Sequence, residues 1–125
     1  MEDVYELFQR GTALLEQGHH HQAAIPLTRA RDLDPDKASI REALGRALFH
    51  SQHYDRAATE FQAVVDRAPT NDFALFCLGR CLQLLGRHAD ARKPLTLAAC
   101  LQPDRRDYRV YRDRARAAAA RTGDA

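Results

Sequence analysis

Three consecutive histidines, His19–His21, are the side chains whose chemistry first needs an explanation. Imidazole nitrogens bind zinc and nickel, so a metal site is one interpretation, and a purification tag or a polar turn are the others. Tags normally sit at a terminus, whereas this run is internal. Consecutive side chains fan outward where a helix begins, and no Cys, Asp or Glu joins them at ligand spacing. We therefore expect a polar turn and no metal.

The cysteines suggest no reaction chemistry. Cys77 and Cys81 lie one helical turn apart, where a disulfide would strain a helix and two thiols alone would make an incomplete metal site. The total of three cysteines is odd, which fits a reducing compartment. No Gly-rich phosphate loop, His–Cys–Asp arrangement or pair of carboxylates stands out. We expect a protein that is not an enzyme and has no cofactor.

An arginine-rich segment near the C-terminus raises the question of nucleic-acid binding. The chain carries 19 basic and 17 acidic residues, for a net charge of +2, and Asp107 and Asp113 interrupt the arginines. A helix over residues 106–121 would gather Tyr108 and Tyr111 on one face and place the arginines on the others. We predict a capping helix with a solvated face and no nucleic-acid partner.

Length and composition indicate one small globular domain. The 125 residues are 45% hydrophobic and 29% charged, which argues against wholesale disorder. Met1 leads directly into acidic Glu2 and Asp3, unlike the basic start of a signal peptide, and no apolar run reaches the length of a membrane span. The chain is predicted to be cytoplasmic, with no membrane partner.

A period of 34 residues organises most of the chain. Glycine at a fixed position allows two helix backbones to approach closely, and apolar residues three and four apart supply the face that each helix buries. Proline ends each unit because it cannot continue a helix. The repeating columns are Gly11, Gly45 and Gly79; Leu14, Leu48 and Leu82; Ala23, Ala57 and Ala91; Leu27, Phe61 and Leu95; Ala30, Val64 and Ala98; and Pro35, Pro69 and Pro103.

This period and these columns resemble the tetratricopeptide repeat, a helix–turn–helix unit that stacks on its neighbours. The second repeat matches the family pattern well, whereas the first is weaker because Arg10 replaces a leucine. The resemblance implies an all-α solenoid of three hairpins, which is six helices, plus a seventh capping helix, in a right-handed superhelix. The predicted domain is 1–125, with repeats over 4–37, 38–71 and 72–105 and the capping helix over 106–121.

Two prolines complicate this pattern. Pro26 and Pro94 fall inside the predicted second helices of the first and third repeats. Proline in a helix removes a hydrogen bond and costs about 3 kcal/mol. We expect these helices either to begin later than the family norm or to kink.

The resemblance also implies a concave groove, lined by the first helices, that binds an extended peptide or partner segment. Aromatic and arginine side chains dominate binding hot spots, so we predict a protein ligand with apolar anchors and at least one carboxylate. The predicted groove residues are Tyr5, Phe8, Thr12, Glu42, Arg46, Phe49, His50, Phe73, Phe76, Cys77 and Arg80.

One specialised version of the family grips a terminal carboxylate with a clamp of lysines and asparagines in this groove. The matching positions here are Phe8, Thr12, Ala43, Phe73 and Cys77, so the clamp is absent. Binding to the acidic tails of heat-shock proteins is therefore not expected.

We predict a non-catalytic protein-interaction module or scaffold. One alternative is a small chaperone-like protein that uses the same groove. Another is a structural protein that self-associates, for example as a homodimer, through the exposed edge of its first repeat. Leu7 and Phe8 favour such an edge, whereas Arg10 and the acidic start disfavour it.

Overall fold

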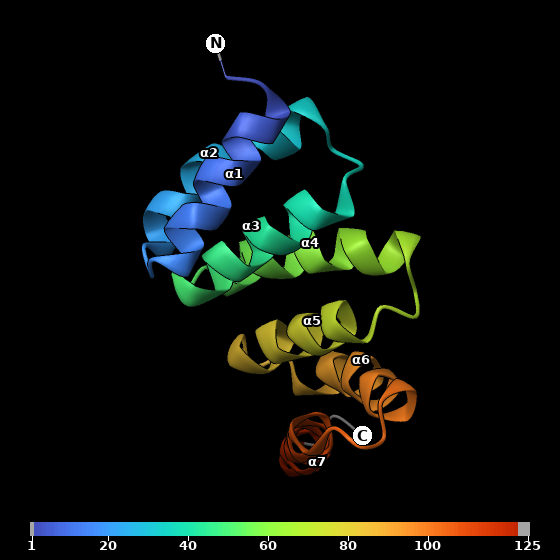
Figure 1. Cartoon of the computed structure of the whole chain (residues 1–125). Helices are drawn as coiled ribbons and strands as arrows, with labels where there is room; N and C mark the ends of the chain where they lie inside the picture. Colours follow the sequence, from blue (N-terminus) through green and yellow to red (C-terminus); the bar gives the residue numbers. More distant parts are fainter. Residues whose placement is uncertain (1, 123–125) are drawn as a thin grey trace. The chain divides into compact units, whose positions relative to one another are not determined.

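The computed structural model describes residues 2–122, which form seven α-helices and no β-strand. The predicted all-α fold of three helix–turn–helix hairpins and a seventh helix is confirmed (Figure 1). The helices are α1 (Val4–Glu16), α2 (His20–Leu33), α3 (Ala38–His50), α4 (Tyr54–Arg67), α5 (Asp72–Leu84), α6 (His88–Leu101) and α7 (Arg106–Arg121).

The chain divides into two compact units between Ala63 and Val64, so that α4 begins in the first unit and ends in the second. In the first unit α1 packs on α2 and α2 on α3, and in the second α5 packs on α6 and α6 on α7 (Figure 1). The predicted single domain and its repeat limits stay a prediction. Buried core clusters comprise Leu7, Ala30 and Ile40 in the first unit, and Leu75, Ala98, Ala99 and Tyr108 in the second.

Each hairpin closes with the same tight turn. A backbone N–H at the end of the turn donates to the carbonyl five residues earlier, as from His19 to Leu14 at 2.9 Å. The residue before this donor has a positive φ, which glycine adopts most easily. Gly18 (φ 82°) and Gly86 (φ 79°) supply it in two hairpins, whereas the middle hairpin uses Gln52 (φ 66°). The middle turn therefore carries a small conformational cost.

The two helices of each hairpin meet where a glycine faces a large side chain of the second helix. A Cβ atom on any of these glycines would overlap that side chain, so the helices approach this closely only because the Cβ is missing. The repeating glycine column is thus a packing requirement. The pairs are Gly11 with Leu27, Gly45 with Phe61, and Gly79 with Leu95.

The two helices that contain an internal proline are as long as the equivalent helix without one. Helices α2 and α6 have 14 residues each, as does α4, which has glutamate at the equivalent position 60. Of the two alternatives expected for α2 and α6, the later start is therefore wrong, and the kink stays a prediction. Pro26 and Pro94 are buried, and the carbonyls that lose their hydrogen bond belong to exposed Gln22 and Asp90, where water can replace the missing donor.

A buried ion-pair cluster joins three helices of the first unit. Glu60 on α4 is only 2% exposed, and its two carboxylate oxygens accept from Arg31 of α2 at 2.7 Å and Arg41 of α3 at 2.9 Å. Arg41 also donates from Nε to the Pro35 carbonyl at 2.7 Å, which fixes the turn before α3. We name Arg31, Glu60 and Arg41 the buried triad. The sequence pattern does not reveal it, because its members lie 10 and 19 residues apart on different helices.

Helix α7 is anchored by one buried tyrosine. The Tyr108 hydroxyl donates to an Asp72 oxygen at 2.8 Å, and its ring stacks on Phe76 with centroids 4.6 Å apart. Burial and the Asp72 hydrogen bond raise the pKa of Tyr108 well above its ordinary value. The neutral hydroxyl is therefore a structural donor that holds α7 against α5.

Candidate interaction surfaces

One face of α5 presents a stripe of apolar side chains with an arginine between them. Phe73, Cys77, Arg80 and Leu84 are spaced four, three and four residues apart, which places them on one side of the helix. Phe73 is 38% exposed and Leu84 is 43% exposed, although both are large and apolar. We name these four residues the α5 stripe. Three of them belong to the predicted groove residues.

Phe76, another predicted groove residue, packs against two tyrosines of α7. Its ring stacks on Tyr108 and meets Tyr111 edge-on at 5.7 Å, and it packs against the core cluster of the second unit. These contacts leave it partly buried. Phe76 therefore helps to seat α7 and offers less free surface than Phe73.

An open hollow of about 320 Å³ lies between α5, the start of α6 and α7. The Arg80 guanidinium carbon lies 3.9 Å from the centre of the Tyr111 ring, and that of Arg114 lies 5.0 Å from the same centre. We name this space the arginine hollow. Its lining residues are Arg80, Gln83, Leu84, His88, Tyr111, Arg114, Ala117, Ala118 and Arg121.

Gln83 fixes the geometry of this hollow. Its side-chain oxygen accepts from Arg80 at 3.0 Å, and its side-chain nitrogen donates to the Tyr111 backbone carbonyl at 2.9 Å. The amide thereby links α5 to α7 and holds the Arg80 side chain toward the Tyr111 ring. Arg80 keeps its Nε and Nη2 hydrogens available for another acceptor, because one of its nitrogens serves Gln83.

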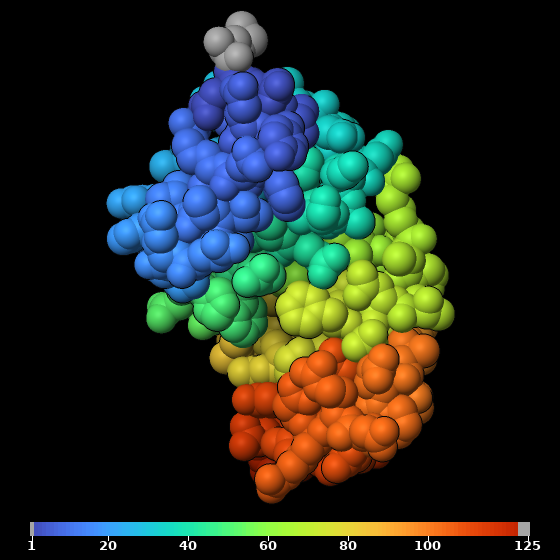
Figure 2. Space-filling view, viewed as in Figure 1, coloured from blue at the N-terminus to red at the C-terminus, as the bar shows by residue number. Residues whose placement is uncertain are grey.

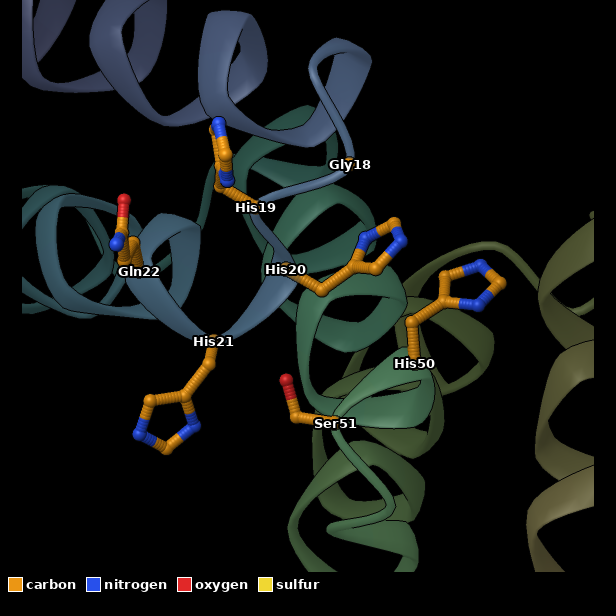
Figure 3. A pocket seen from close by; sticks show the side chains of 7 residues that line it. All are labelled: Gly18, His19, His20, His21, Gln22, His50 and Ser51. Carbon is orange, nitrogen blue, oxygen red and sulfur yellow. The ribbon is translucent and has the colours of Figure 1, made fainter.

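A second hollow, of about 400 Å³, lies in the first unit where α1 turns into α2 beside the end of α3. His20 and His50 point toward one another across it, with ring centroids 4.5 Å apart, whereas His19 and His21 point away in different directions (Figure 3). We name it the histidine hollow. Its lining residues are Gly18, His19, His20, His21, Gln22, His50 and Ser51.

Of the three sequential histidines, only His19 lies in the predicted turn, because α2 begins at His20 and includes His21. Stacked rings do not converge their nitrogens on one ion, and no group of three His, Cys, Asp or Glu residues within 2–122 is placed to hold a metal. Burial, the neighbouring His20 and the Arg46 charge lower the pKa of His50 below its ordinary value. The His50 imidazole therefore favours its uncharged form.

The predicted groove residues of the first unit have mixed surroundings. Tyr5 is 66% exposed and its hydroxyl accepts from Gln9, whereas Phe8 packs against the core cluster of that unit. Thr12 donates to the Phe8 carbonyl and so points back onto its own helix. Helix α1 forms part of the surface in the space-filling view (Figure 2). Of the remainder, Arg46 and His50 are exposed, and Glu42 and Phe49 are half-buried.

None of the three cysteines, which all lie within residues 2–122, forms a disulfide, and their surroundings differ. Cys81 is buried, and burial raises the pKa of its thiol to about 12. Cys77 is partly exposed and Cys100 is exposed. Cys81 therefore acts as a small packing residue, while Cys100 is the most accessible of the three to a thiol reagent.

Sequence reasoning missed most of the arginine hollow. Arg114 was expected on a solvated face and Tyr111 on the packing face of the capping helix. They are three residues apart, a spacing that brings side chains together on a helix and could have paired them. Nothing in the sequence shows that Arg80 reaches the same ring from another helix, 31 residues earlier.

Comparison with known proteins decides the family. The family model of the tetratricopeptide repeat matches residues 8–72 and 51–108, which is most of the chain. The chain belongs to the tetratricopeptide repeat family. Proteins of this family generally mediate protein–protein interactions and are generally not catalytic.

Among curated proteins, the chain is similar to superkiller complex protein 3. The identity is 30% with the mouse protein and 29% with the human protein, each over 83 residues. This match covers 66% of the chain and only 5% of either relative. The similarity therefore concerns a short stretch of a much longer protein.

Solved structures share the fold. MamA (MSR-1) superposes with a TM-score of 0.86 at 24% identity, covering 98% of this chain and 68% of MamA. The first tetratricopeptide domain of Spaghetti (RPAP3), bound to an HSP90 peptide, gives 0.86 at 19% identity and covers 94% of both chains. YrrB, described as having an unusual peptide-binding site, gives 0.81 at 24% identity over 91% of this chain and 58% of YrrB. No helix within 2–122 is both long and apolar enough to cross a bilayer.

Proposed function

We propose that this chain is a non-catalytic interaction module that binds an extended segment of another protein along the exposed face of its first helices. Family membership supports the protein–protein part of this proposal. Two structural neighbours are described with peptides or peptide-binding sites, which supports an extended segment as the form of the ligand.

The observation that carries the proposal is the α5 stripe. Phe73 is 38% exposed and Leu84 is 43% exposed, and covering the exposed part of such an apolar side chain stabilises by about 1 kcal/mol. Arg80 between them supplies a charged donor, and apolar anchors with a central arginine are typical of binding hot spots. A partner segment with apolar side chains spaced along the stripe would cover both anchors.

The proposal can be tested with peptides selected from a random heptapeptide display library against the purified chain. A selected peptide should bind in fluorescence polarisation, and Phe73→Ala combined with Leu84→Ala should weaken its binding at least tenfold. The matched control is Leu97→Ala, which removes an equally exposed apolar side chain from α6. Equal weakening by the control, or no enriched peptide at all, would contradict the proposal.

The HSP90 peptide serves as a specificity control. Because the lysine and asparagine clamp is absent, this peptide should bind far more weakly than a selected one. Light scattering over a concentration series tests self-association at the same time. From the sequence, Leu7 favours self-association through the edge of the first repeat. In the structure Leu7 is fully buried and does not contribute to such an edge.

A further inference from the structure

The arginine hollow concentrates positive charge without an internal counter-charge. Arg80, Arg114 and Arg121 all line it, together with His88, and none of its nine lining residues is acidic. Within residues 2–122 no carboxylate forms an ion pair with any of these three arginines, whereas Arg87 pairs with Asp90 and Arg112 pairs with Asp113. Like charges that share one concave site raise its potential, and an anionic ligand lowers it.

The Tyr111 ring in the hollow contacts two guanidinium groups. Arg80 and Arg114 both lie over the Tyr111 ring, which attracts cations through its π-face. A guanidinium in contact with a ring face still presents N–H groups at its edge, and those edges bind planar oxyanions with two hydrogen bonds. Gln83 holds Arg80 in this position before any ligand arrives, which lowers the entropy cost of binding.

The hollow also has one apolar wall. Leu84 belongs to both the α5 stripe and the lining of the hollow, and Ala117 and Ala118 are small. A ligand group that enters here meets a hydrophobic surface on one side and donors on the other. This combination fits a carboxylate that follows or precedes an apolar side chain in a peptide better than it fits a fully hydrated inorganic ion.

We propose that the arginine hollow binds a carboxylate of a protein segment, with Arg80 and Arg114 as the donors, Tyr111 as the platform and Gln83 as the positioning residue. The inference rests on the proposed function, because the carboxylate belongs to a partner segment that also covers the α5 stripe. It adds the capping helix to the binding surface and assigns the site a ligand chemistry.

The test follows the arginine Nε–Hε resonances by NMR while acetyl-Leu-Asp, a dipeptide with two carboxylates, is added to the full chain. The Arg80 and Arg114 signals should shift saturably, and Arg80→Gln should raise the apparent Kd about tenfold, as expected for loss of a charged hydrogen-bonding partner. Arg114→Gln is the second variant, since Arg114 is exposed and its replacement leaves the buried face of α7 unchanged. Arg116→Gln, an exposed arginine of α7 outside the hollow, should change the Kd less than twofold.

Three results would overturn the inference. Equal weakening by Arg116→Gln would show diffuse attraction to a basic surface. Tighter binding of inorganic phosphate than of the dipeptide would assign the hollow to phosphoryl groups. Unchanged binding of acetyl-Leu-Asn-amide, which has no carboxylate, would show that only the leucine is recognised.

The outcomes also separate this inference from the proposed function. If selected heptapeptides bind in a Phe73-dependent manner but the dipeptide does not shift Arg80, the carboxylate site is wrong and the interaction module stands. If the dipeptide binds at Arg80 but no heptapeptide is enriched, the site stands and the proposed segment-binding function is wrong.

Discussion

The histidine hollow and the arginine hollow share two equivalent repeat positions, and most of their other lining residues differ. His20 and His88 are 68 residues apart, which is two repeat periods, and each begins the second helix of a hairpin. The partner position holds His50 in the first unit and Ala118 in the second. The imidazole at 50 stacks on His20, whereas Ala118 and His88 line the arginine hollow together with three arginines. The side chains at equivalent repeat positions therefore decide what lines each hollow.

A second contrast concerns how consecutive hairpins are joined. The buried triad of the first unit, Arg31, Glu60 and Arg41, occupies the positions that hold Val65, Pro94 and Leu75 in the second. Val65 and Leu75 belong to an apolar cluster there. The same junction therefore tolerates either an ion-pair cluster or a hydrophobic one. A buried ion-pair cluster is costly to break but not inherently better than apolar packing.

The largest expected effect comes from breaking the triad. Within residues 2–122, Glu60 is the one carboxylate that pairs with both Arg31 and Arg41, so Glu60→Ala should lower the free energy of unfolding by about 3 kcal/mol. Urea unfolding followed by circular dichroism measures the loss. The triple variant Arg31→Val, Glu60→Leu, Arg41→Leu should stay within about 1 kcal/mol of the parent, because it copies apolar packing. A triple variant as unstable as Glu60→Ala would contradict this comparison.

A smaller effect is expected when a histidine is introduced into the arginine hollow at position 118, which corresponds to His50 in the repeat. Ala118→His places an imidazole beside His88 and should weaken acetyl-Leu-Asp binding about tenfold, equivalent to about 1.4 kcal/mol, by occupying the space. The same NMR titration measures it. Ala120→His, at an exposed position of α7, is the control and should leave binding within twofold. Undiminished binding to the Ala118→His variant would place the ligand elsewhere.

Replacing Gln52 in the turn of the middle hairpin should stabilise the protein. Gln52→Gly relieves the positive φ that Gly18 and Gly86 adopt freely, so the free energy of unfolding should rise by about 0.5–1 kcal/mol. The midpoint of thermal unfolding should increase by about 3 °C. Gly86→Gln makes the reverse change and should lower the midpoint by a similar amount. Two shifts of the same sign would show that turn conformation is not the cause.

The smallest effect is a pH dependence centred on the histidine hollow. The pKa of His50 is lowered by burial and by the neighbouring His20 and Arg46, so the unfolded chain binds more protons than the folded one. Stability should therefore fall as pH drops below about 6.5 and level off below the folded-state pKa. Urea titrations between pH 7.5 and 5 should show a flatter profile for His50→Asn than for the parent. A steeper profile for that variant would reverse the assigned sign.

Much of the fold follows from the sequence because the repeat columns encode contacts that are local. Gly11, Gly45 and Gly79 each face a residue 16 positions later, and a periodic pattern exposes such a relation directly. The histidine turn follows for the same reason. Of the two alternatives expected for α2 and α6, a later start or a kink, the later start was wrong, because an exposed carbonyl tolerates the loss of one donor better than proline's average cost suggests.

The candidate sites were harder to predict because they depend on contacts that do not recur with the 34-residue repeat. Arg80 was placed on the groove surface, but its ring partner Tyr111 comes from the capping helix, which departs from the repeat pattern. Phe76 was expected to be an open platform, yet Tyr108 covers one face of it. Both contacts depend on how α7 docks on α5, and sequence spacing does not specify that docking.

The glycine contacts described above have a consequence for how the chain folds. Each contact joins two residues of one hairpin that are only 16 positions apart in the sequence. Because the loop between them is short, a hairpin can form this contact early in folding. Three such early closures share the same spacing, and folding can begin at more than one of them before the rest of the chain is ordered. A substitution that adds a methyl group at Gly79 should thus slow only the routes that start in the third hairpin, a kinetic signature that stopped-flow refolding can read.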